Sequence, residues 1–426
     1  MHKLMPELNY PINAQIEVTE DCNQRCFYCY NSGRTDFSDS KRMTLEEAQR
    51  LSEILVTDVK PFNIVVTGGE PLMNMPATIE FAKLCAQSSM HCSINSNLAL
   101  LDKDKLQQLK AVNTNLGFLV SIPSINEDVF EAITGRRNLK KVLSNLELLF
   151  LEQIDPTVNM VVHKKNKDQV YEEGLFLHKQ YGLRTFAATP ALNPAFGEPC
   201  EFVLDKESMI DVFRDLNRLK ENGLSVAVLE STPFCMLPED LRHLDFLRRG
   251  CSAGRTGIQI TYNGDVRSCS RSPFVEGNLF SEKFRVIWEK LKSYRENKYA
   301  PKECDDCAEL DYCHGSCRYE GLDIGERPNK PDSRMIGKLK TSVHCDKETK
   351  IDPDKVYVFV PYKQRQEDKS NVTIYANKKY LTLDDRTFSF VEGIKKQGFH
   401  LDSFPNDLKA KATYIGKRLI SRGFLK

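Results

Sequence analysis

The first half of the chain alternates short apolar runs with longer stretches that carry apolar residues at helical spacing. Six runs have the β-branched composition of strands, and they occupy residues 14–18, 63–67, 91–95, 116–121, 157–162 and 185–189. Helical patterns lie between them, and Thr44 with Glu47 forms a capping-box pattern at the start of residues 44–55. This alternation predicts an α/β fold in which a parallel sheet curves into a partial (β/α)6 barrel of the TIM type. Functional residues of such a barrel gather at the carboxyl ends of the strands.

The regular alternation fades between about residue 230 and residue 350, where Cys, Gly, Pro and charged residues predominate. Residues 258–266 still predict a β-hairpin, because Asn263 and Gly264 form a favoured two-residue turn. A region with so little regular structure needs another source of stability. We expect bound cofactors to supply it.

A third pattern follows residues 347–354, which are charged, contain a proline and are typical of a linker. Short apolar runs then predict strands, and longer stretches predict helices that end the chain. The strands are expected at residues 356–360, 372–376 and 380–383, and the helices at residues 388–397 and 407–422. This order is typical of a small winged-helix-like domain.

Charge and composition exclude several classes of function. The chain has 60 Lys and Arg against 59 Asp and Glu, so its net charge of +1 creates no field that would attract nucleic acid or an acidic membrane. No apolar run is long enough to span a bilayer. The first residues also lack the basic start, apolar stretch and cleavage site of a signal peptide. We therefore expect a cytoplasmic protein with no nucleic-acid or membrane partner.

Cysteine is the residue type that changes this picture most. The chain has 14 cysteines, of which three lie near residue 25, eight lie between residues 235 and 345, and none follows residue 345. Disulfides are disfavoured in a reducing compartment, so crowded cysteines there more often hold metal.

The first group, Cys22, Cys26 and Cys29, lies in one loop directly after the first predicted strand. Three thiolates on a 4Fe-4S cluster leave one iron without a protein ligand, and that iron can bind a substrate or cosubstrate. The alternative is a zinc site, which needs a fourth ligand nearby. The nearest histidine, His2, is poorly placed to be that ligand.

This C-x3-C-x2-C loop, with an aromatic residue just before its last cysteine, resembles the signature of the radical S-adenosylmethionine (SAM) superfamily. The run after the second strand, Gly68-Gly69-Glu70-Pro71, is similar to the family's GGEP motif, whose backbone and acid hold the amino group of the methionine of SAM. The glycines are expected to allow the close backbone approach that a small ligand requires.

The same resemblance implies further SAM contacts at the ends of later strands. The residues that stand where related enzymes contact the ribose and carboxylate of SAM are Asn95, Ser96, Asn97 and Ser121, and Arg136 offers a positive charge for the carboxylate. Pro123 departs from the family pattern, because many relatives have an aspartate at that position.

The later cysteines resemble the SPASM domain of radical SAM enzymes that modify peptides and proteins. The seven in this pattern are Cys251, Cys269, Cys304, Cys307, Cys313, Cys317 and Cys345. SPASM domains commonly hold two auxiliary 4Fe-4S clusters, which need eight thiolates, and Cys235 fits as the eighth.

The resemblance divides these eight thiolates between two clusters. One would use Cys235, Cys251, Cys269 and Cys317, and the other Cys304, Cys307, Cys313 and Cys345. With the first loop this makes three 4Fe-4S clusters, and SAM is the further cofactor. The alternative for this region is a pair of zinc ribbons. We expect the remaining cysteines, Cys85, Cys92 and Cys200, to include two buried core thiols, with Cys200 the least determined.

Three domains are expected from these observations. They are a radical SAM partial barrel at residues 10–205, a SPASM domain with its bridging region at residues 206–349, and the C-terminal domain at residues 352–426. The last resembles the PqqD-like recognition element of enzymes that mature ribosomal peptides, which binds a leader peptide as an added edge strand beside a helix. Residues 372–376 or 380–383 are the expected edge, and Tyr414 and Ile415 the expected pocket residues. The alternative is a capping domain.

The resemblance implies a radical SAM oxidoreductase in which one electron from the reduced first cluster cleaves SAM into methionine and a 5'-deoxyadenosyl radical. We expect this radical to install a carbon-carbon or thioether crosslink in a ribosomally synthesised precursor peptide. The expected partners are the precursor with its leader sequence and a flavodoxin- or ferredoxin-type electron donor.

Other functions remain open from the sequence. One is oxidation of Ser or Cys as in anaerobic sulfatase maturases, although Ser270 stands where that family's proton-accepting aspartate is expected. Epimerisation and backbone excision are further peptide modifications within the same class. A different class is an electron-transfer or zinc structural protein without SAM chemistry.

Overall fold

The chain divides into two compact units in the computed structural model. It describes residues 8–29, 41–192, 201–320, 330–341, 351–352, 355–377, 379–404 and 406–426. One unit is Pro11–Ser342, and the other combines Met1–Tyr10 with Val343–Lys426. The predicted barrel and the cysteine-rich segment therefore fold together, while the start of the chain belongs with its end.

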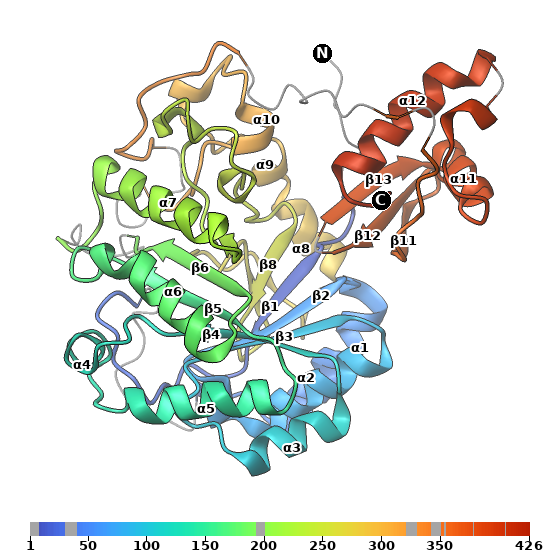
Figure 1. Ribbon diagram of the computed structural model, residues 1–426. Helices are drawn as coiled ribbons and strands as arrows, with labels where there is room; N and C mark the ends of the chain where they lie inside the picture. Colours follow the sequence, from blue (N-terminus) through green and yellow to red (C-terminus); the bar gives the residue numbers. More distant parts are fainter. Residues whose placement is uncertain are drawn as a thin grey trace. The chain divides into compact units, whose positions relative to one another are not determined.

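Six parallel strands form the barrel sheet, and strands that follow one another in sequence also lie side by side (Figure 1). These strands are β1 (Asn13–Glu17), β2 (Asn63–Thr67), β3 (His91–Ser96), β4 (Leu116–Ser121), β5 (Thr157–Val162) and β6 (Thr185–Pro190). The predicted parallel α/β sheet is confirmed.

Helices follow the strands and cover one face of the sheet (Figure 1). They are α1 (Leu45–Ile54), α2 (Met75–Gln87), α3 (Lys103–Val112), α4 (Glu127–Thr134), α5 (Leu139–Leu151), α6 (Val170–Tyr181) and α7 (Lys206–Glu221). Thr44 caps α1, since its side chain accepts a hydrogen bond from the backbone N–H of Glu47 and the Glu47 carboxylate accepts one from the Thr44 N–H. The predicted capping box is therefore present. Fully buried Ile64, Val66 and Phe81 mark the core between sheet and helices.

The cysteine-rich segment extends the barrel sheet beyond β1. The strand β8 (Gly257–Ile260) pairs parallel with β1, and β9 (Asp265–Arg267) and β10 (Gly277–Asn278) follow as antiparallel neighbours. The hairpin between β8 and β9 was predicted, but its addition to the barrel sheet was not. On the other edge, β7 (Ser225–Ala227) pairs parallel with β6.

Short helical elements complete this unit and carry several of the cysteines. The α-helices are α8 (Phe284–Lys290), α9 (Lys292–Arg295) and α10 (Leu310–Cys313). The single turns of other helix types are η2 (Leu55–Val59), η3 (Pro71–Met73), η4 (Lys167–Gln169), η5 (Phe234–Met236), η6 (Asp245–Leu247) and η7 (Lys302–Cys304).

The C-terminal unit is a three-stranded antiparallel sheet packed against helices. Its elements are β11 (Lys363–Asp368), β12 (Asn371–Ala376), β13 (Lys379–Asp384), α11 (Asp385–Ile394), the turn η8 (Leu401–Ser403) and α12 (Asn406–Ser421). The sheet order is β11-β12-β13, so β12 is central. The expectation that residues 372–376 form an edge is therefore wrong, whereas residues 380–383 do lie in an edge strand.

Two further details of this unit differ from expectation. Residues 356–360 form only isolated bridges, Tyr357 with Phe399 and Phe359 with Leu425, instead of a strand of the sheet. Ile415 is buried in the core and so cannot line a surface pocket, whereas Tyr414 is exposed. Most of the predicted linker at residues 347–354 lies outside the described residues.

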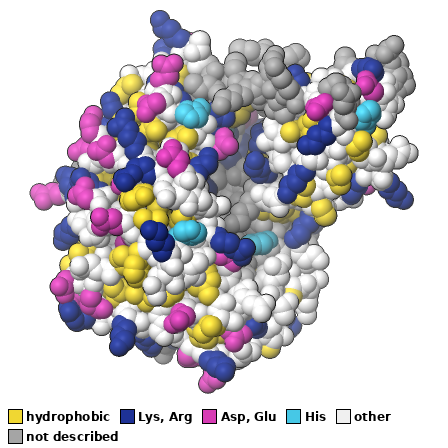
Figure 2. Space-filling model, in the orientation of Figure 1, with side chains coloured by type: hydrophobic (Ala, Val, Ile, Leu, Met, Phe, Trp, Pro, Cys, Tyr) yellow, Lys and Arg dark blue, Asp and Glu magenta, His cyan; other side chains and the backbone are white. Residues whose placement is uncertain are grey.

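The surface matches the balanced composition. On the face shown in Figure 2, Lys and Arg side chains alternate with Asp and Glu, and no large patch has one sign. None of the helices in the described ranges has the length and apolar character needed to cross a bilayer.

One carboxyl group is buried in the barrel without a countercharge. Glu173 on α6 is fully buried, and its Oε2 accepts a hydrogen bond of 3.2 Å from the Ile125 N–H. Its Oε1 has no hydrogen-bond partner in the described part of the chain. Burial raises the pKa of Glu173 to about 8. At neutral pH the group is therefore mostly a neutral acid that anchors the loop after β4.

This burial predicts that Glu173→Gln stabilises the protein at alkaline pH. The pKa of Glu173 is about 8 in the folded protein and 4.5 at its ordinary value, so between pH 4.5 and pH 8 the folded wild type binds more protons than the unfolded chain. Its free energy of unfolding therefore falls as the pH rises through this range. Gln keeps the acceptor for Ile125 and has no charge. We expect the variant to gain stability relative to wild type progressively over this range, as measured by urea unfolding below and above it. Glu172→Gln, at the exposed neighbouring position, should show no such gain. Parallel pH profiles for wild type and Glu173→Gln would contradict the burial of a carboxyl group here.

Candidate functional site

The first cysteine group lies at the carboxyl end of β1, where a barrel places its functional residues. Cys22 is buried, and Cys26 and Cys29 are partly exposed. The loop is fixed to the end of α4, because the N–H of Arg25 donates to the carbonyl of Thr134 at 2.8 Å. A tight turn also joins two of these cysteines, since the N–H of Cys29 donates to the carbonyl of Cys26.

Gly68 and Gly69 press the end of β2 against the start of this loop. A Cβ on Gly69 would lie 1.8 Å from the carbonyl oxygen of Asp21, and one on Gly68 would lie 2.3 Å from that of Thr19. Two backbone hydrogen bonds of 2.7 Å close the contact, from Gly69 N to Thr19 O and from Glu70 N to Asp21 O. Close packing of two backbones thus requires these glycines, in addition to any ligand that approaches them.

Glu70 joins this contact to the end of β3. Its carboxylate is buried, and Oε1 accepts hydrogen bonds from the Ser96 hydroxyl at 2.8 Å and the Leu72 N–H at 3.1 Å. Its Oε2 accepts from the Asn97 N–H at 2.8 Å. The Asn97 amide in turn donates to Asn23 Oδ1 in the cysteine loop at 2.9 Å. The ends of three strands therefore form one hydrogen-bonded network.

The other expected SAM contacts lie around this network. Pro71 is buried in the turn η3, directly after Glu70. Arg136 is exposed, and its Nε donates to the carbonyl of Asn23 at 2.8 Å, so its charge stands beside the loop. Ser121 ends β4 and hydrogen-bonds Tyr28 of the loop. Asn95 lies on β3, opposite Leu119 of β4.

A histidine that no motif indicated also packs on the loop. His163, directly after β5, is fully buried, and its ring centroid lies 4.8 Å from that of Phe27. Burial and the neighbouring charge of Lys165 lower the pKa of His163 to about 4, so the ring is neutral. Its Nδ1 accepts from the Lys165 N–H, which leaves the proton on Nε2, an atom without a hydrogen-bond partner among the described residues. Only its position at the end of the fifth strand could have indicated it.

Four later cysteines line one pocket. Cys235, Cys304, Cys307 and Cys313 line one pocket, whose other walls include Leu310 and Leu339. Two of the sulfurs also accept backbone hydrogen bonds, Cys307 from Leu339 at 3.4 Å and Cys313 from Phe234. We name these four cysteines the outer thiol group.

Cys251, Cys269 and Cys317 form a second group, which we name the hairpin thiol group. Cys251 precedes β8 and Cys269 follows β9, so the hairpin brings them to the same end. Burial and the neighbouring thiols Cys251 and Cys317 raise the pKa of Cys269. Burial likewise raises the pKa of Cys317 to about 12.

The position of Cys235 differs from the one that the expected grouping implies. It was assigned to the cluster of Cys251, Cys269 and Cys317, but η5 places it in the outer thiol group. The physical reason is that the segment before β8 folds back on α10, where the Phe234 N–H bonds Cys313. Cys345 and Cys200 lie outside the described residues. Cys85 and Cys92 are buried in the barrel core, as expected.

The chemistry of these donors fits iron-sulfur clusters. A 4Fe-4S cluster takes thiolate ligands, and the outer thiol group offers four around one cavity. Buried thiols with raised pKa values are protonated until they bind metal, so cluster assembly would release protons here.

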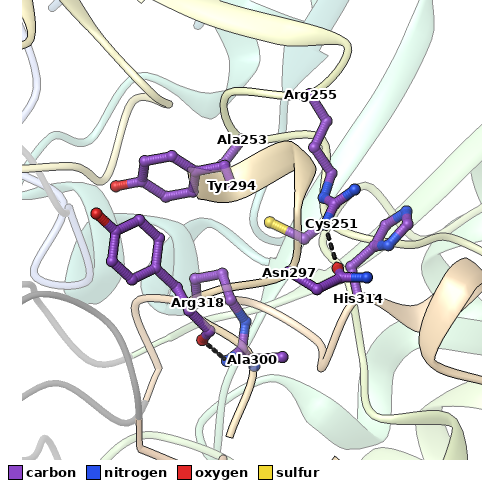
Figure 3. Close-up of a pocket in the computed structure, with 9 residues that line it drawn as sticks. Cys251, Ala253, Arg255, Tyr294, Asn297, Ala300, His314 and Arg318 are labelled. Atoms are coloured by element: carbon purple, nitrogen blue, oxygen red, sulfur yellow. Dashed lines mark hydrogen bonds between the residues drawn. The ribbon is translucent and has the colours of Figure 1, made fainter. Parts of the chain in front are cut away.

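A polar cavity of about 220 Å³ lies beside Cys251 (Figure 3). Arg255, His314 and Arg318 line it together with Tyr294. Burial and the charges of the two arginines lower the pKa of His314 to about 3, so this histidine is neutral. Arg318 also acts electrostatically on Cys304 and Cys313. One residue of this lining, Cys251, thus belongs to the hairpin thiol group, and another, Arg318, acts on the outer thiol group.

Comparisons with known proteins match both cysteine regions to family models. Residues 16–176 match the radical SAM superfamily, and residues 251–308 match an iron-sulfur cluster-binding domain called SPASM. The AdoMet-dependent heme synthase of Methanosarcina barkeri is 22% identical over 75% of this chain and 92% of its own length. The subtilosin biosynthesis protein AlbA of Bacillus subtilis is 22% identical over 76% of this chain and 71% of its own length.

Solved structures share the fold. Streptococcus suis SuiB bound to the precursor peptide SuiA has a TM-score of 0.62 at 16% identity, over 78% of this chain and 77% of that chain. The protein anSMEcpe with bound AdoMet has a TM-score of 0.59 at 17% identity, over 76% of this chain and 94% of that chain. At these identities the likeness shows the fold alone.

The close approach of β2 to the cysteine loop predicts that Gly69→Ala disrupts the site. The added Cβ would collide with the backbone of Asp21, so one of the two segments must shift, at a cost of about 1–3 kcal/mol. We expect a lower thermal midpoint and weaker SAM binding, measured by differential scanning calorimetry and equilibrium dialysis.

Gly393→Ala is the matched control, because a Cβ at this position in α11 meets no atom within 4 Å. That variant should keep the wild-type midpoint or exceed it slightly. Equal stability and SAM affinity in the two variants would show that the backbone contact at Gly69 is unimportant.

Proposed function

The chain is a radical SAM enzyme with a SPASM domain, and we propose that it installs a carbon-carbon or thioether crosslink in a ribosomally synthesised precursor peptide. The observation that carries the proposal is that three elements occur together in one chain. These are a three-cysteine loop at the barrel end, two further thiol groups, and a separate C-terminal unit with an edge strand. Among the relatives, SuiB binds a precursor peptide and AlbA serves bacteriocin biosynthesis, which supports a peptide substrate.

The residues at the barrel end suit the binding and orientation of SAM. Cys22, Cys26 and Cys29 would hold a cluster that, when reduced in the presence of SAM, supplies a 5'-deoxyadenosyl radical able to remove a hydrogen atom from carbon. Glu70 offers a carboxylate for the amino group of SAM, and its hydrogen bonds to Ser96 and Asn97 fix its position. A fixed carboxylate lowers the entropic cost of orienting the reacting group.

Two residues beside the loop complete this arrangement. Arg136 places a positive charge at Asn23, where it can pair with the carboxylate of SAM. His163 is fully buried and packs against Phe27 of the loop, so water does not reach the histidine ring on this side. Exclusion of water protects a reactive carbon radical from side reactions.

The two later thiol groups suit the second half of an oxidation. Crosslinking removes two hydrogens from the peptide. One leaves as a hydrogen atom and the other as a proton, so one electron remains on the peptide and needs an acceptor. The outer thiol group supplies four ligands for one auxiliary cluster, and the hairpin thiol group supplies three for another, with Cys345 a further candidate ligand. An oxidised cluster held there is a chemically suitable acceptor for that electron.

The C-terminal unit suits leader binding by addition of a strand at β13. The other edge strand, β11, already contacts the start of the chain: Asn9 donates from N to Glu367 Oε2 at 2.9 Å and from Nδ2 to Glu367 O at 3.0 Å. Arg365 donates to the Tyr10 carbonyl at 3.0 Å. The helix α11 packs beside β13, as strand addition next to a helix requires. This unit would then be a PqqD-like recognition element.

A second candidate function is oxidation of a Ser or Cys side chain in a protein. The shared fold with anSMEcpe, which has been solved with AdoMet and a bound peptide, favours it. It makes a different prediction for the C-terminal unit, because a maturase of that kind needs no leader peptide.

We expect about twelve irons per chain in anaerobically prepared protein, as three 4Fe-4S clusters require. Cys235 tests the grouping of the later thiols. In a Cys304→Ala background, adding Cys235→Ala should remove no further iron, because both residues would serve one cluster. In a Cys269→Ala background the same change should cost roughly four more irons. Iron and sulfide analysis with Mössbauer spectroscopy provides the measurement.

Cys85→Ala, which removes a buried core thiol, should leave the iron content unchanged. The opposite pattern, with additional loss only in the Cys304→Ala background, would restore the grouping of Cys235 with Cys251, Cys269 and Cys317. Zinc in place of iron would contradict the proposed function.

Removal of residues 352–426, which keeps the candidate ligand Cys345, tests leader binding. Cleavage of SAM without peptide should continue, because the SAM residues lie in the other unit. The KM for the precursor should rise by roughly a hundredfold, since the truncated enzyme loses the second point of attachment. A detached leader peptide should compete with the precursor for the full-length enzyme and leave the truncated enzyme unaffected. An unchanged KM, with no competition by the leader, would favour oxidation of a leaderless substrate.

A further inference from the structure

Arg271 lies inside the cysteine-rich region, two residues after Cys269. Its side chain is 4% exposed, and its Nη1 donates a hydrogen bond of 3.1 Å to the sulfur of Cys317. The same nitrogen lies 3.4 Å from Oε2 of Glu320, whose side chain is 3% exposed. The guanidinium therefore stands between a thiol of the hairpin thiol group and a buried carboxylate.

This contact is the end of a chain of buried charges. Glu320 also lies 3.3 Å from Arg334, which pairs through two hydrogen bonds of 2.7 and 2.6 Å with the fully buried carboxylate of Asp332. Two arginines and two acids make this set neutral. Buried charges are costly and gain little stability over apolar packing, so stability alone is a weak reason to place them beside a cysteine.

Arginines beside the other two sets of cysteines donate hydrogen bonds to backbone carbonyls. Arg318, which acts electrostatically on two thiols of the outer thiol group, donates hydrogen bonds to the carbonyls of Ser316 and Tyr299. In the first loop, Arg25 directs Nη1 to the carbonyls of Cys22 and Gln24. At Cys317, in contrast, a guanidinium donates directly to the cysteine sulfur.

A positive charge at this position favours an extra electron on a cluster bound through Cys317. Reduction adds one negative charge, and a hydrogen bond to a ligand sulfur together with a nearby cation stabilises the reduced form. Arginine keeps its charge at all physiological pH values, so the effect does not depend on protonation. Burial strengthens it, because little water screens the interaction.

We propose that Arg271, acting through Cys317, raises the reduction potential of the cluster held by the hairpin thiol group, so that this cluster receives the electron released from the peptide. Arg271 acts on the cluster through the sulfur of Cys317 and is not itself a ligand. Its counterion Glu320 limits the rise in reduction potential. The proposal rests on the proposed function, since it requires clusters at both later thiol groups.

Two variants change the charge at the sulfur in opposite directions. Arg271→Gln with Glu320→Gln removes one charge of each sign and leaves the net charge unchanged, so the hairpin cluster should become harder to reduce. Glu320→Gln alone leaves the arginine without its nearest counterion, so the same cluster should become easier to reduce. If the double variant failed to assemble, Glu320→Gln would still test the proposal.

The measurement is a redox titration of the full-length, iron-loaded protein, followed by electron paramagnetic resonance. We expect one cluster midpoint to shift to more negative potential in the double variant and to more positive potential in Glu320→Gln, with the other midpoints unchanged. The shift should persist when Cys235→Ala is added, because that change affects the outer cluster.

Three results would overturn the proposal. Unchanged midpoints in both variants with full iron content would show that Arg271 does not tune any cluster. A shift that disappears with Cys235→Ala would assign the effect to the outer thiol group instead. Wild-type protein with iron only at the first loop would remove the proposed function itself, a failure that iron analysis reports before any titration.

Discussion

The rest of the site depends on the contact between the end of β2 and the start of the cysteine loop. Gly68 and Gly69 allow two backbones to meet at distances that no side chain permits, and Glu70 then ties the contact to Ser96, which ends β3, and to Asn97, which follows it. A loop that must hold three thiols in fixed positions gains its rigidity from these neighbours, since it has little regular structure of its own. Glu70 thus has a structural role in the protein and a proposed binding role toward SAM, and the same geometry serves both.

The second structural constraint is the addition of the β8–β9 hairpin to the barrel sheet. Because β8 pairs with β1, the hairpin thiol group is fixed to the strand that also carries the first cysteine loop at its other end. Electron transfer between sites requires fixed separations, and a shared strand provides one without a long rigid linker. The buried charges from Arg271 to Asp332 then distinguish the hairpin thiol group electrostatically from the outer thiol group, although both consist of cysteine.

Much of the barrel could be predicted, because its strands are apolar runs of regular spacing and its loop motifs lie directly after them. The predictions failed where a residue's role depends on contacts distant in sequence. Cys235 has no fixed spacing to Cys304, so only the folded chain could show that they share a cavity. The strand β11 has no apolar residue in Lys363–Asp368 and is held by pairing with β12 and by the buried pair Arg365 and Glu367. His163 belongs to no local motif, and its role follows only from its packing on Phe27.

Hydrogen abstraction from a peptide is the central claim, and isotope transfer tests it most directly. A precursor peptide with deuterated side chains would be incubated anaerobically with the reduced, iron-loaded enzyme and SAM, and the 5'-deoxyadenosine would be analysed by mass spectrometry. We expect deuterium in the 5'-deoxyadenosine in proportion to the peptide modified, because the radical takes its hydrogen from the substrate. Modified peptide accompanied only by unlabelled 5'-deoxyadenosine, or no 5'-deoxyadenosine at all, would contradict it.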